Sequence, residues 1–95
     1  MTLMPRDTAE TLALQALAWL AGNEELLPVF MGATGSSQDE LRAQAGQPEF
    51  LASVLDFLLM DDAWVIACCD ALQQPYPQLM QARAALPGGA QINWT

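Results

Sequence analysis

The sequence predicts an all-α fold, a compact bundle of five to six short helices in a single domain. The composition is the first indication, because alanine, leucine and glutamine dominate while valine is sparse. The second is that apolar residues recur about every 3.6 positions, which places them on one face of a helix. The third is size: 95 residues, of which 53% are hydrophobic, can build one core and not two.

The first helix is expected to begin at Asp7 or Thr8 and to end before Gly22, which serves as a C-terminal stop. Its helical wheel predicts one broad apolar face and one polar face. The apolar face comprises Leu12, Ala16, Leu17, Trp19 and Leu20, and the opposite face comprises Thr8, Thr11, Gln15 and Ala18.

Asn23 is predicted to cap the second helix, with Glu24 and Glu25 in its first turn, where the helix dipole favours acids. Pro28 is early enough to be tolerated but delays the start of regular helix. The loop Gly32–Gly35 ends this segment.

Ser37 and Glu40 form the sequence signature of a capping box, in which each side chain bonds the other residue's backbone amide. The helix that they open is short, running to about Ala45, with Gly46 as its stop. Pro48 then begins the next helix, at a position where proline is favoured.

The helix expected over residues 48–60 is the most apolar of the chain. Its polar positions form one narrow stripe, whereas the rest of its wheel is apolar over roughly 200°, about twice what a surface helix needs. We therefore expect this helix to be the buried centre of the fold, or to be covered partly by a second subunit. The stripe comprises Glu49, Ser53, Asp56 and Met60, and the apolar arc comprises Phe50, Leu51, Val54, Leu55, Phe57, Leu58 and Leu59.

A break is predicted at Asp61–Asp62, because a continuous helix would bury two unpaired carboxylates at a cost of several kcal/mol. Either aspartate can instead cap a new helix over residues 63–72. That helix is apolar nearly all round, with Asp70 its only charge. We expect it to pack against the preceding helix as an antiparallel or steeply crossed pair.

The last helix is predicted from Pro77 to Ala85 or Leu86, with Arg83 near its cation-favouring C-terminal end. We expect the helical domain to span residues 1–89 and the tail, residues 90–95, to be loose or docked. The side chains expected to point inward are Leu79, Met80 and Leu86.

The charge balance narrows the function classes. Eleven acids face three arginines, with no lysine and no histidine, for a net charge of −8. Such a chain lacks the basic surface that direct binding to nucleic acid or an anionic membrane requires. Histidine and lysine chemistry is excluded for want of the residues. We expect no enzymatic activity and no cofactor.

Compartment is indicated by two further features. The first residues lack the pattern of a secretory signal, and the longest apolar runs, about ten residues, are half the length of a membrane span. Cys68 and Cys69 are adjacent, a poor arrangement for an internal disulfide. We expect buried free thiols in a cytoplasmic protein, with a redox or metal-binding pair as the alternative.

Two motifs resemble a phosphate-binding loop and a metal site, but both have simpler structural explanations. The segment Gly32–Ser37 resembles a phosphate loop, but it follows a helix and lacks the lysine that such a loop needs. Asp56, Asp61 and Asp62 could be imagined as ligands of Mg²⁺ or Ca²⁺, but their spacing fits no calcium loop. An inter-helix loop explains the first, and a solvated stripe plus a helix cap explains the second. No catalytic, cofactor-binding or metal-ligating residue is assigned.

The excess of apolar helix surface predicts a non-enzymatic protein–protein interaction module, with a homodimer as one form of it. Trp64, Trp94 and Phe57 are the candidate interface residues, since tryptophan is enriched at interface hot spots. Trp19 and Trp64 also suit the core, while Trp94 could dock on its own domain or on a neighbour. An alternative is an acidic decoy that occupies a basic nucleic-acid-binding surface of a partner. A third is a small enzyme or metal protein that uses carboxylates or the two cysteines.

Four stretches of the chain carry a family resemblance: Gly32–Gly35, Asp39–Arg42, Phe50–Leu59 and Ala82–Gly88. Together they resemble the bacterial domain-of-unknown-function family 3572, over about residues 9–89. Where an apolar residue would be expected after Thr34-Gly35, this chain has Ser36. The resemblance implies a small helical bacterial protein and supplies no activity and no catalytic residues.

Overall fold

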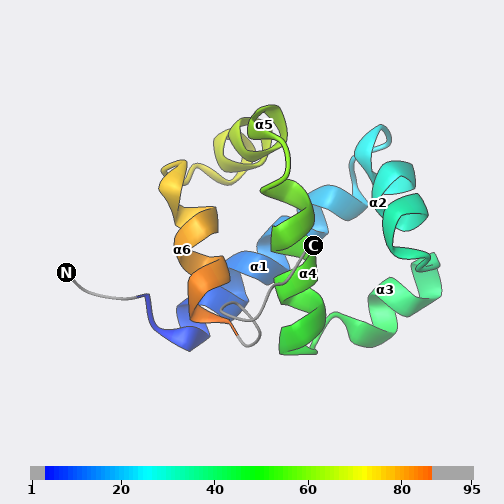
Figure 1. Cartoon of the computed structure of the whole chain (residues 1–95), viewed down its shortest axis with the longest axis horizontal. Coiled ribbons are helices and arrows are strands. Elements are labelled where there is room, and N and C mark those ends of the chain that lie inside the picture. The colour runs from blue at the N-terminus through cyan, green and yellow to red at the C-terminus, as the bar shows by residue number, and fades with distance from the viewer. Residues whose placement is uncertain (1–3, 87–95) are drawn as a thin grey trace, which may run out of the picture.

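Six α-helices make up the part of the chain that the computed structural model describes, residues 4–86 (Figure 1). These residues contain no β-strand, so the prediction of an all-α bundle is confirmed. The predicted tail, residues 90–95, and with it the boundary at residue 89, lies outside the described residues. The helices are α1 (Arg6–Ala21), α2 (Leu26–Thr34), α3 (Gln38–Gln44), α4 (Pro48–Leu58), α5 (Asp62–Leu72) and α6 (Pro77–Ala85).

Helices α1 and α4 form the centre of the bundle. α1 packs most extensively against α6 and α4, and less against α5. Alanines at three positions of α1, spaced four and three apart, are completely buried, which allows neighbouring helices to approach closely. α4 is buried over most of its circumference, as its sequence predicts. The buried residues of these helices are Ala9, Leu12, Ala13, Ala16, Leu17 and Leu20 on α1, and Phe50, Leu51, Ala52, Val54, Leu55, Phe57 and Leu58 on α4.

Hydrogen bonds between neighbouring residues confirm the predicted caps of α3 and α5 and correct the start of α2. Asn23 Oδ1 accepts from the backbone N–H of Leu26 at 2.9 Å, but regular helix begins only at Leu26, so Glu24 and Glu25 precede α2 instead of lying in its first turn. The Ser37 hydroxyl accepts from the N–H of Glu40 at 3.3 Å, and the Glu40 carboxylate accepts from the N–H of Ser37 at 3.1 Å. Asp61 Oδ1 accepts from the N–H of Ala63 at 2.8 Å and caps α5. Each of these donors would otherwise lack a partner at a helix start.

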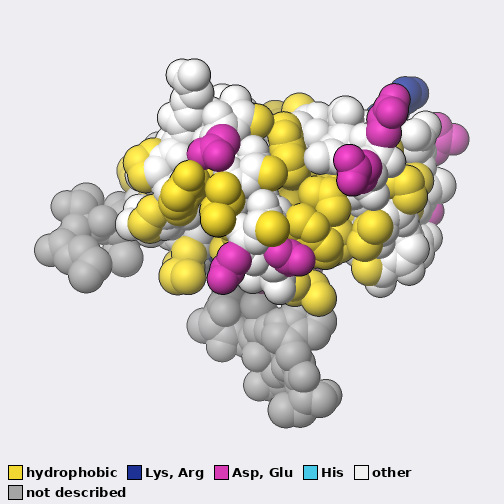
Figure 2. All heavy atoms as spheres, turned by 90° about the horizontal axis from the view of Figure 1, so that it is seen from above, with side chains coloured by type: hydrophobic (Ala, Val, Ile, Leu, Met, Phe, Trp, Pro, Cys, Tyr) yellow, Lys and Arg dark blue, Asp and Glu magenta, His cyan; other side chains and the backbone are white. Residues whose placement is uncertain are grey.

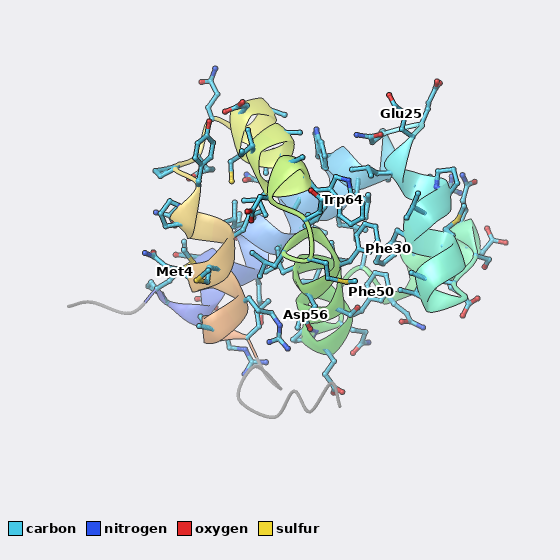
Figure 3. All side chains as sticks on the ribbon, turned by 45° about the horizontal axis from the view of Figure 1, so that its top comes forward. Met4, Glu25, Phe30, Phe50, Asp56 and Trp64 are labelled. Atoms are coloured by element: carbon cyan, nitrogen blue, oxygen red, sulfur yellow. The ribbon has the colours of Figure 1, made fainter. Side chains whose placement is uncertain are left out.

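Helices α2 and α3 lie on the side of α4 that faces away from α6 (Figure 1). Gly35 ends α2 in a left-handed conformation, with φ of 74°, which glycine adopts without strain. On α2 the fully buried Phe30 points toward α4 (Figure 3). Helix α2 is thus joined to the centre of the bundle by an aromatic side chain.

The position of α5 agrees only in part with the prediction. It does contact the preceding helix, where Trp64 stacks on Phe57, but it packs more extensively on α1. Only Cys68 and Cys69 are fully buried on α5, while Ile66 is 43% exposed. A helix that is apolar on nearly every side has no pattern to say which side faces inward.

The inward face of α6 also differs from the prediction. Leu79 and Leu86 are buried as expected, but Met80 is 66% exposed. Arg83 lies in the last turn of α6, as predicted, and is 8% exposed, a burial that the sequence did not indicate. The spacing of Leu79, Arg83 and Leu86 is four and three, so all three lie on the same helix face.

Candidate functional site

A row of four aromatic rings crosses from α2 to α5. Phe30 of α2 meets Phe50 and Phe57 of α4 edge to face, with ring centroids 6.2 and 5.1 Å apart. Phe57 stacks in turn on Trp64 of α5, with centroids 4.7 Å apart. Both geometries are favourable for aromatic pairs and hold Phe57 between two neighbours.

The candidate site is a groove of about 540 Å³ between the C-terminal end of α2 and the polar stripe of α4. Phe57 belongs to its wall and is 5% exposed, so the row of rings supports the groove from beneath. Met60, just beyond the end of α4, is 78% exposed beside it. We call this feature the α2–α4 groove; it is lined by Ala33, Thr34, Ser53, Asp56, Phe57 and Met60.

The polar side chains of the α2–α4 groove are hydrogen-bonded within the protein. The Thr34 hydroxyl donates to the carbonyl of Phe30 at 2.8 Å, and the Ser53 hydroxyl donates to the carbonyl of Phe50 at 2.7 Å. Asp56 accepts from Arg83. Since these groups already have partners, the groove presents mainly apolar surface.

The Asp56–Arg83 pair joins two helices across 27 residues of sequence. Arg83 Nε lies 2.5 Å from Asp56 Oδ1, and the two side chains are 9% and 21% exposed. Arg83 Nη1 is buried with no hydrogen-bond partner among the described residues. Asp56 is therefore not simply a solvated member of the stripe, as the sequence suggested. The helical spacing of Arg83 with two buried leucines is the signal that could have predicted its burial.

Two of the three candidate interface residues are brought together here. Trp64 is partly buried and its ring stacks on the ring of Phe57. Trp94 lies outside the described residues. The sequence did not identify the groove residues Ala33, Thr34 and Met60 as a binding surface. The groove is formed by two helices, and the pattern of either helix alone does not reveal it.

The two cysteines are free, buried and not joined to each other. Burial, with the neighbouring Cys69 as a second cause, raises the pKa of Cys68 to about 12. Burial, with Asp70 as a second cause, also raises the pKa of Cys69. Both groups are thiols at neutral pH, whereas a nucleophile or metal ligand must be a thiolate.

The carboxylates of the described chain are spread over several helix starts. Asp7, Asp39 with Glu40, Glu49 and Asp62 lie in the first turns of α1, α3, α4 and α5. On the face shown in Figure 2 the acids stand at separate points beside apolar side chains. Within residues 4–86 no group of three or more acids and cysteines is placed to hold a metal ion.

The glycine-rich segment is explained by its local structure. Gly32 lies inside α2, Gly35 ends that helix, and Ser37 caps α3. These roles account for the residues that suggested a phosphate loop.

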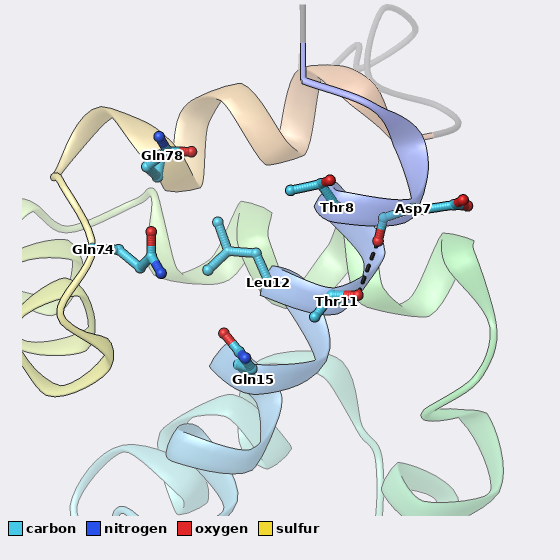
Figure 4. Close-up of a pocket in the computed structure, with 7 residues that line it drawn as sticks. All are labelled: Asp7, Thr8, Thr11, Leu12, Gln15, Gln74 and Gln78. Carbon is cyan, nitrogen blue, oxygen red and sulfur yellow. Dashed lines mark hydrogen bonds between the residues drawn. The ribbon is translucent and has the colours of Figure 1, made fainter.

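A second, more polar cleft of about 330 Å³ lies between α1 and the segment that joins α5 to α6 (Figure 4). The Thr11 hydroxyl donates to the carbonyl of Asp7 at 3.0 Å. All polar side chains that line this cleft are exposed or only partly buried, so the cleft offers no fully buried polar group aimed at a ligand. The lining comprises Asp7, Thr8, Thr11, Leu12, Gln15, Gln74 and Gln78.

Comparison with known proteins identifies one family. No helix in residues 4–86 has both the length and the apolar character needed to cross a bilayer. No curated protein and no solved structure shows significant similarity to the chain. Residues 6–89, nearly the whole chain, match the family described as "Protein of unknown function (DUF3572)", and the chain therefore belongs to that family.

Proposed function

We propose that the protein is a non-enzymatic interaction module that binds another protein in the α2–α4 groove. One observation carries the proposal: the polar groups of the groove are bonded within the protein, while Met60 holds a large apolar side chain 78% exposed beside it. An exposed methionine next to a rigid aromatic side chain is typical of surfaces that bind apolar anchors of a partner.

The chemistry of the side chains supports a binding role over a catalytic one. The chain has no histidine and no lysine, and burial keeps Cys68 in its thiol form. The lining has no free base or nucleophile, since its hydroxyls and Asp56 are bonded to other groups. Such a surface provides shape and apolar contact.

The test compares two methionines that differ mainly in position. Met60 lies beside the groove, whereas Met80 is 66% exposed on α6, which packs on the other side of the bundle. In quantitative affinity capture from the native cell, we expect the tagged native protein to bind a specific set of proteins. The tagged Met60→Gln variant should capture at least tenfold less of these proteins. The Met80→Gln variant should retain that set. Equal capture by all three proteins would contradict the proposal.

A homodimer is the alternative form of the same proposal. Light scattering distinguishes a homodimer from a complex with another protein. If a second copy occupies the groove, the native protein and the Met80→Gln variant should have the mass of two chains. The Met60→Gln variant should then have the mass of one chain. Both variants should keep native stability within about 0.5 kcal/mol, as is usual for exposed positions.

A further inference from the structure

We propose that the occupant of the α2–α4 groove is an amphipathic helical segment of another protein, apolar on the face that enters the groove and carrying Lys or Arg at its flanks. This inference rests on the proposed function and adds the chemistry of the partner. It is drawn from the length of the groove's α4 wall and from the charges at its two ends.

The polar stripe of α4 sets the length of the segment. Glu49, Ser53, Asp56 and Met60 follow one another at helical spacing along it, and the last three line the groove. With a rise of about 1.5 Å per residue, the lining from Ser53 to Met60 is about 10 Å long, which corresponds to two turns of a partner helix. Helices that bind in grooves place apolar side chains at positions i, i+3 or i+4, and i+7, which cover a similar length.

Acids stand at both ends of this stripe. Glu49 is exposed at the start of α4, and Asp61 and Asp62 follow Met60 directly. The middle is different, because Asp56 is bound by the buried Arg83. The site is therefore apolar at its centre and negative at its ends.

No exposed arginine in residues 4–86 belongs to the lining of the groove. Arg6 pairs with Glu10 on α1, Arg42 lies on α3, and Arg83 is 9% exposed and held by Asp56. The face in Figure 2 shows a band of apolar side chains with acids beside it, and arginine is visible only at one edge. Positive flanks on the partner complement this distribution.

The negative charge around the groove also distinguishes between the kinds of molecule that could bind there. A second copy of the chain brings another net charge of −8, and nucleic acid or an anionic membrane brings phosphates of the same sign as the acids. A basic amphipathic segment is the occupant whose charge is opposite and whose apolar face fits the groove.

The test uses labelled helical peptides of about 18 residues, long enough for measurable helicity. One has leucine at helical spacing with lysine at both flanks, and the second replaces each lysine by glutamate. Fluorescence anisotropy with the full chain should show binding of the lysine peptide at least tenfold tighter than of the glutamate peptide. Binding to Met60→Gln should be at least tenfold weaker than to Met80→Gln.

The electrostatic part is tested with a second matched pair. Asp62 lies in the first turn of α5, two residues after Met60 of the groove lining, and Asp7 lies in the first turn of α1 and lines the second cleft. The Asp62→Asn substitution should weaken the affinity for the lysine peptide by roughly two- to fivefold at about 50 mM salt, and by less at about 500 mM salt. Asp7→Asn should leave the affinity unchanged.

The outcomes separate this inference from the proposed function. Equal binding of the two peptides, binding of neither, or a Met60-dependent dimer of the chain would overturn the basic amphipathic partner. If cellular proteins are still lost from Met60→Gln in the capture experiment, the groove remains a binding site for a partner of other chemistry. If that capture also shows no dependence on Met60 and the chain is a monomer, both proposals fail.

Discussion

Arg83 on α6 donates from Nε to Oδ1 of Asp56 on α4, and its side chain is the more deeply buried of the two, at 9% exposed against 21%. A buried guanidinium without its carboxylate is costly, whereas a carboxylate that reaches water is less so. The pair therefore ties α6 to α4 and removes a charge from the wall of the α2–α4 groove.

This difference in burial predicts unequal effects of the two single substitutions. Asp56→Leu should lower the free energy of unfolding by about 3 kcal/mol, because it leaves the guanidinium unpaired. Arg83→Met should lower it by about 1 kcal/mol, since the remaining carboxylate has access to solvent. The double variant should be more stable than Asp56→Leu alone, as urea denaturation would measure. Equal single effects that add in the double variant would show that the two side chains are not coupled.

The attachment of α2 to α4 depends on Phe30. This residue is completely buried and meets both Phe50 and Phe57. Phe30→Ala should lower the free energy of unfolding by about 3–5 kcal/mol, because it removes these contacts and leaves a cavity. Phe30→Leu, which keeps most of the volume, is the control and should cost less. A loss below about 1 kcal/mol for the alanine variant would mean that α2 is held by other contacts.

The two aspartates before α5 should differ although they are adjacent. Asp61 accepts the backbone N–H of Ala63, whereas Asp62 is exposed in the first turn. Asp61→Ala should cost about 1 kcal/mol of stability through loss of the cap. Asp62→Ala should cost about 0.5 kcal/mol or less, since it loses only a dipole interaction. Thermal and urea unfolding of both variants measure the difference, and equal losses would contradict the role of Asp61 as the cap.

The buried thiols predict low reactivity in the folded protein. Because its pKa is raised to about 12, Cys68 is protonated at pH 8 and should react with a thiol reagent only after unfolding. Absorbance of the released reagent in native buffer and in denaturant measures this. Rapid reaction of both cysteines in native buffer would show that α5 opens readily.

The same shift predicts how stability depends on pH. A thiol whose pKa is raised in the folded state stabilises that state below its ordinary pKa of 9.0, and this contribution is lost as pH rises toward about 12. The native protein should therefore lose stability above pH 9.0 more steeply than the Cys68→Ala variant. Urea unfolding at a series of pH values checks this, and parallel profiles for the two proteins would contradict it.

Most helix boundaries were predictable because they depend on neighbouring residues. The bonds of Asn23, Ser37, Glu40 and Asp61 each span two or three positions. The burial of α4 was predictable for a related reason, since its apolar arc was too wide for a surface helix. The predicted end of this helix, at Met60, is two residues later than the observed end of α4 at Leu58, because no residue in its last turn marks a helix end.

The groove and its surroundings could not be predicted in the same way. Met80 and Leu79 are adjacent apolar residues on α6, yet the first is exposed and the second buried. The choice depends on which neighbouring helix is present, because the free energy of burial comes from contacts between helices.

The sequence by itself determined the fold class, the helix starts and the near absence of basic residues, because caps, periodicity and composition act within a few residues of the chain. Only the tertiary structure decided that α5 lies on α1, that Arg83 meets Asp56 across 27 residues, and that Phe57 and Met60 line one groove. These features arise from packing between segments far apart in sequence, and no single helix contains the information that selects its partner.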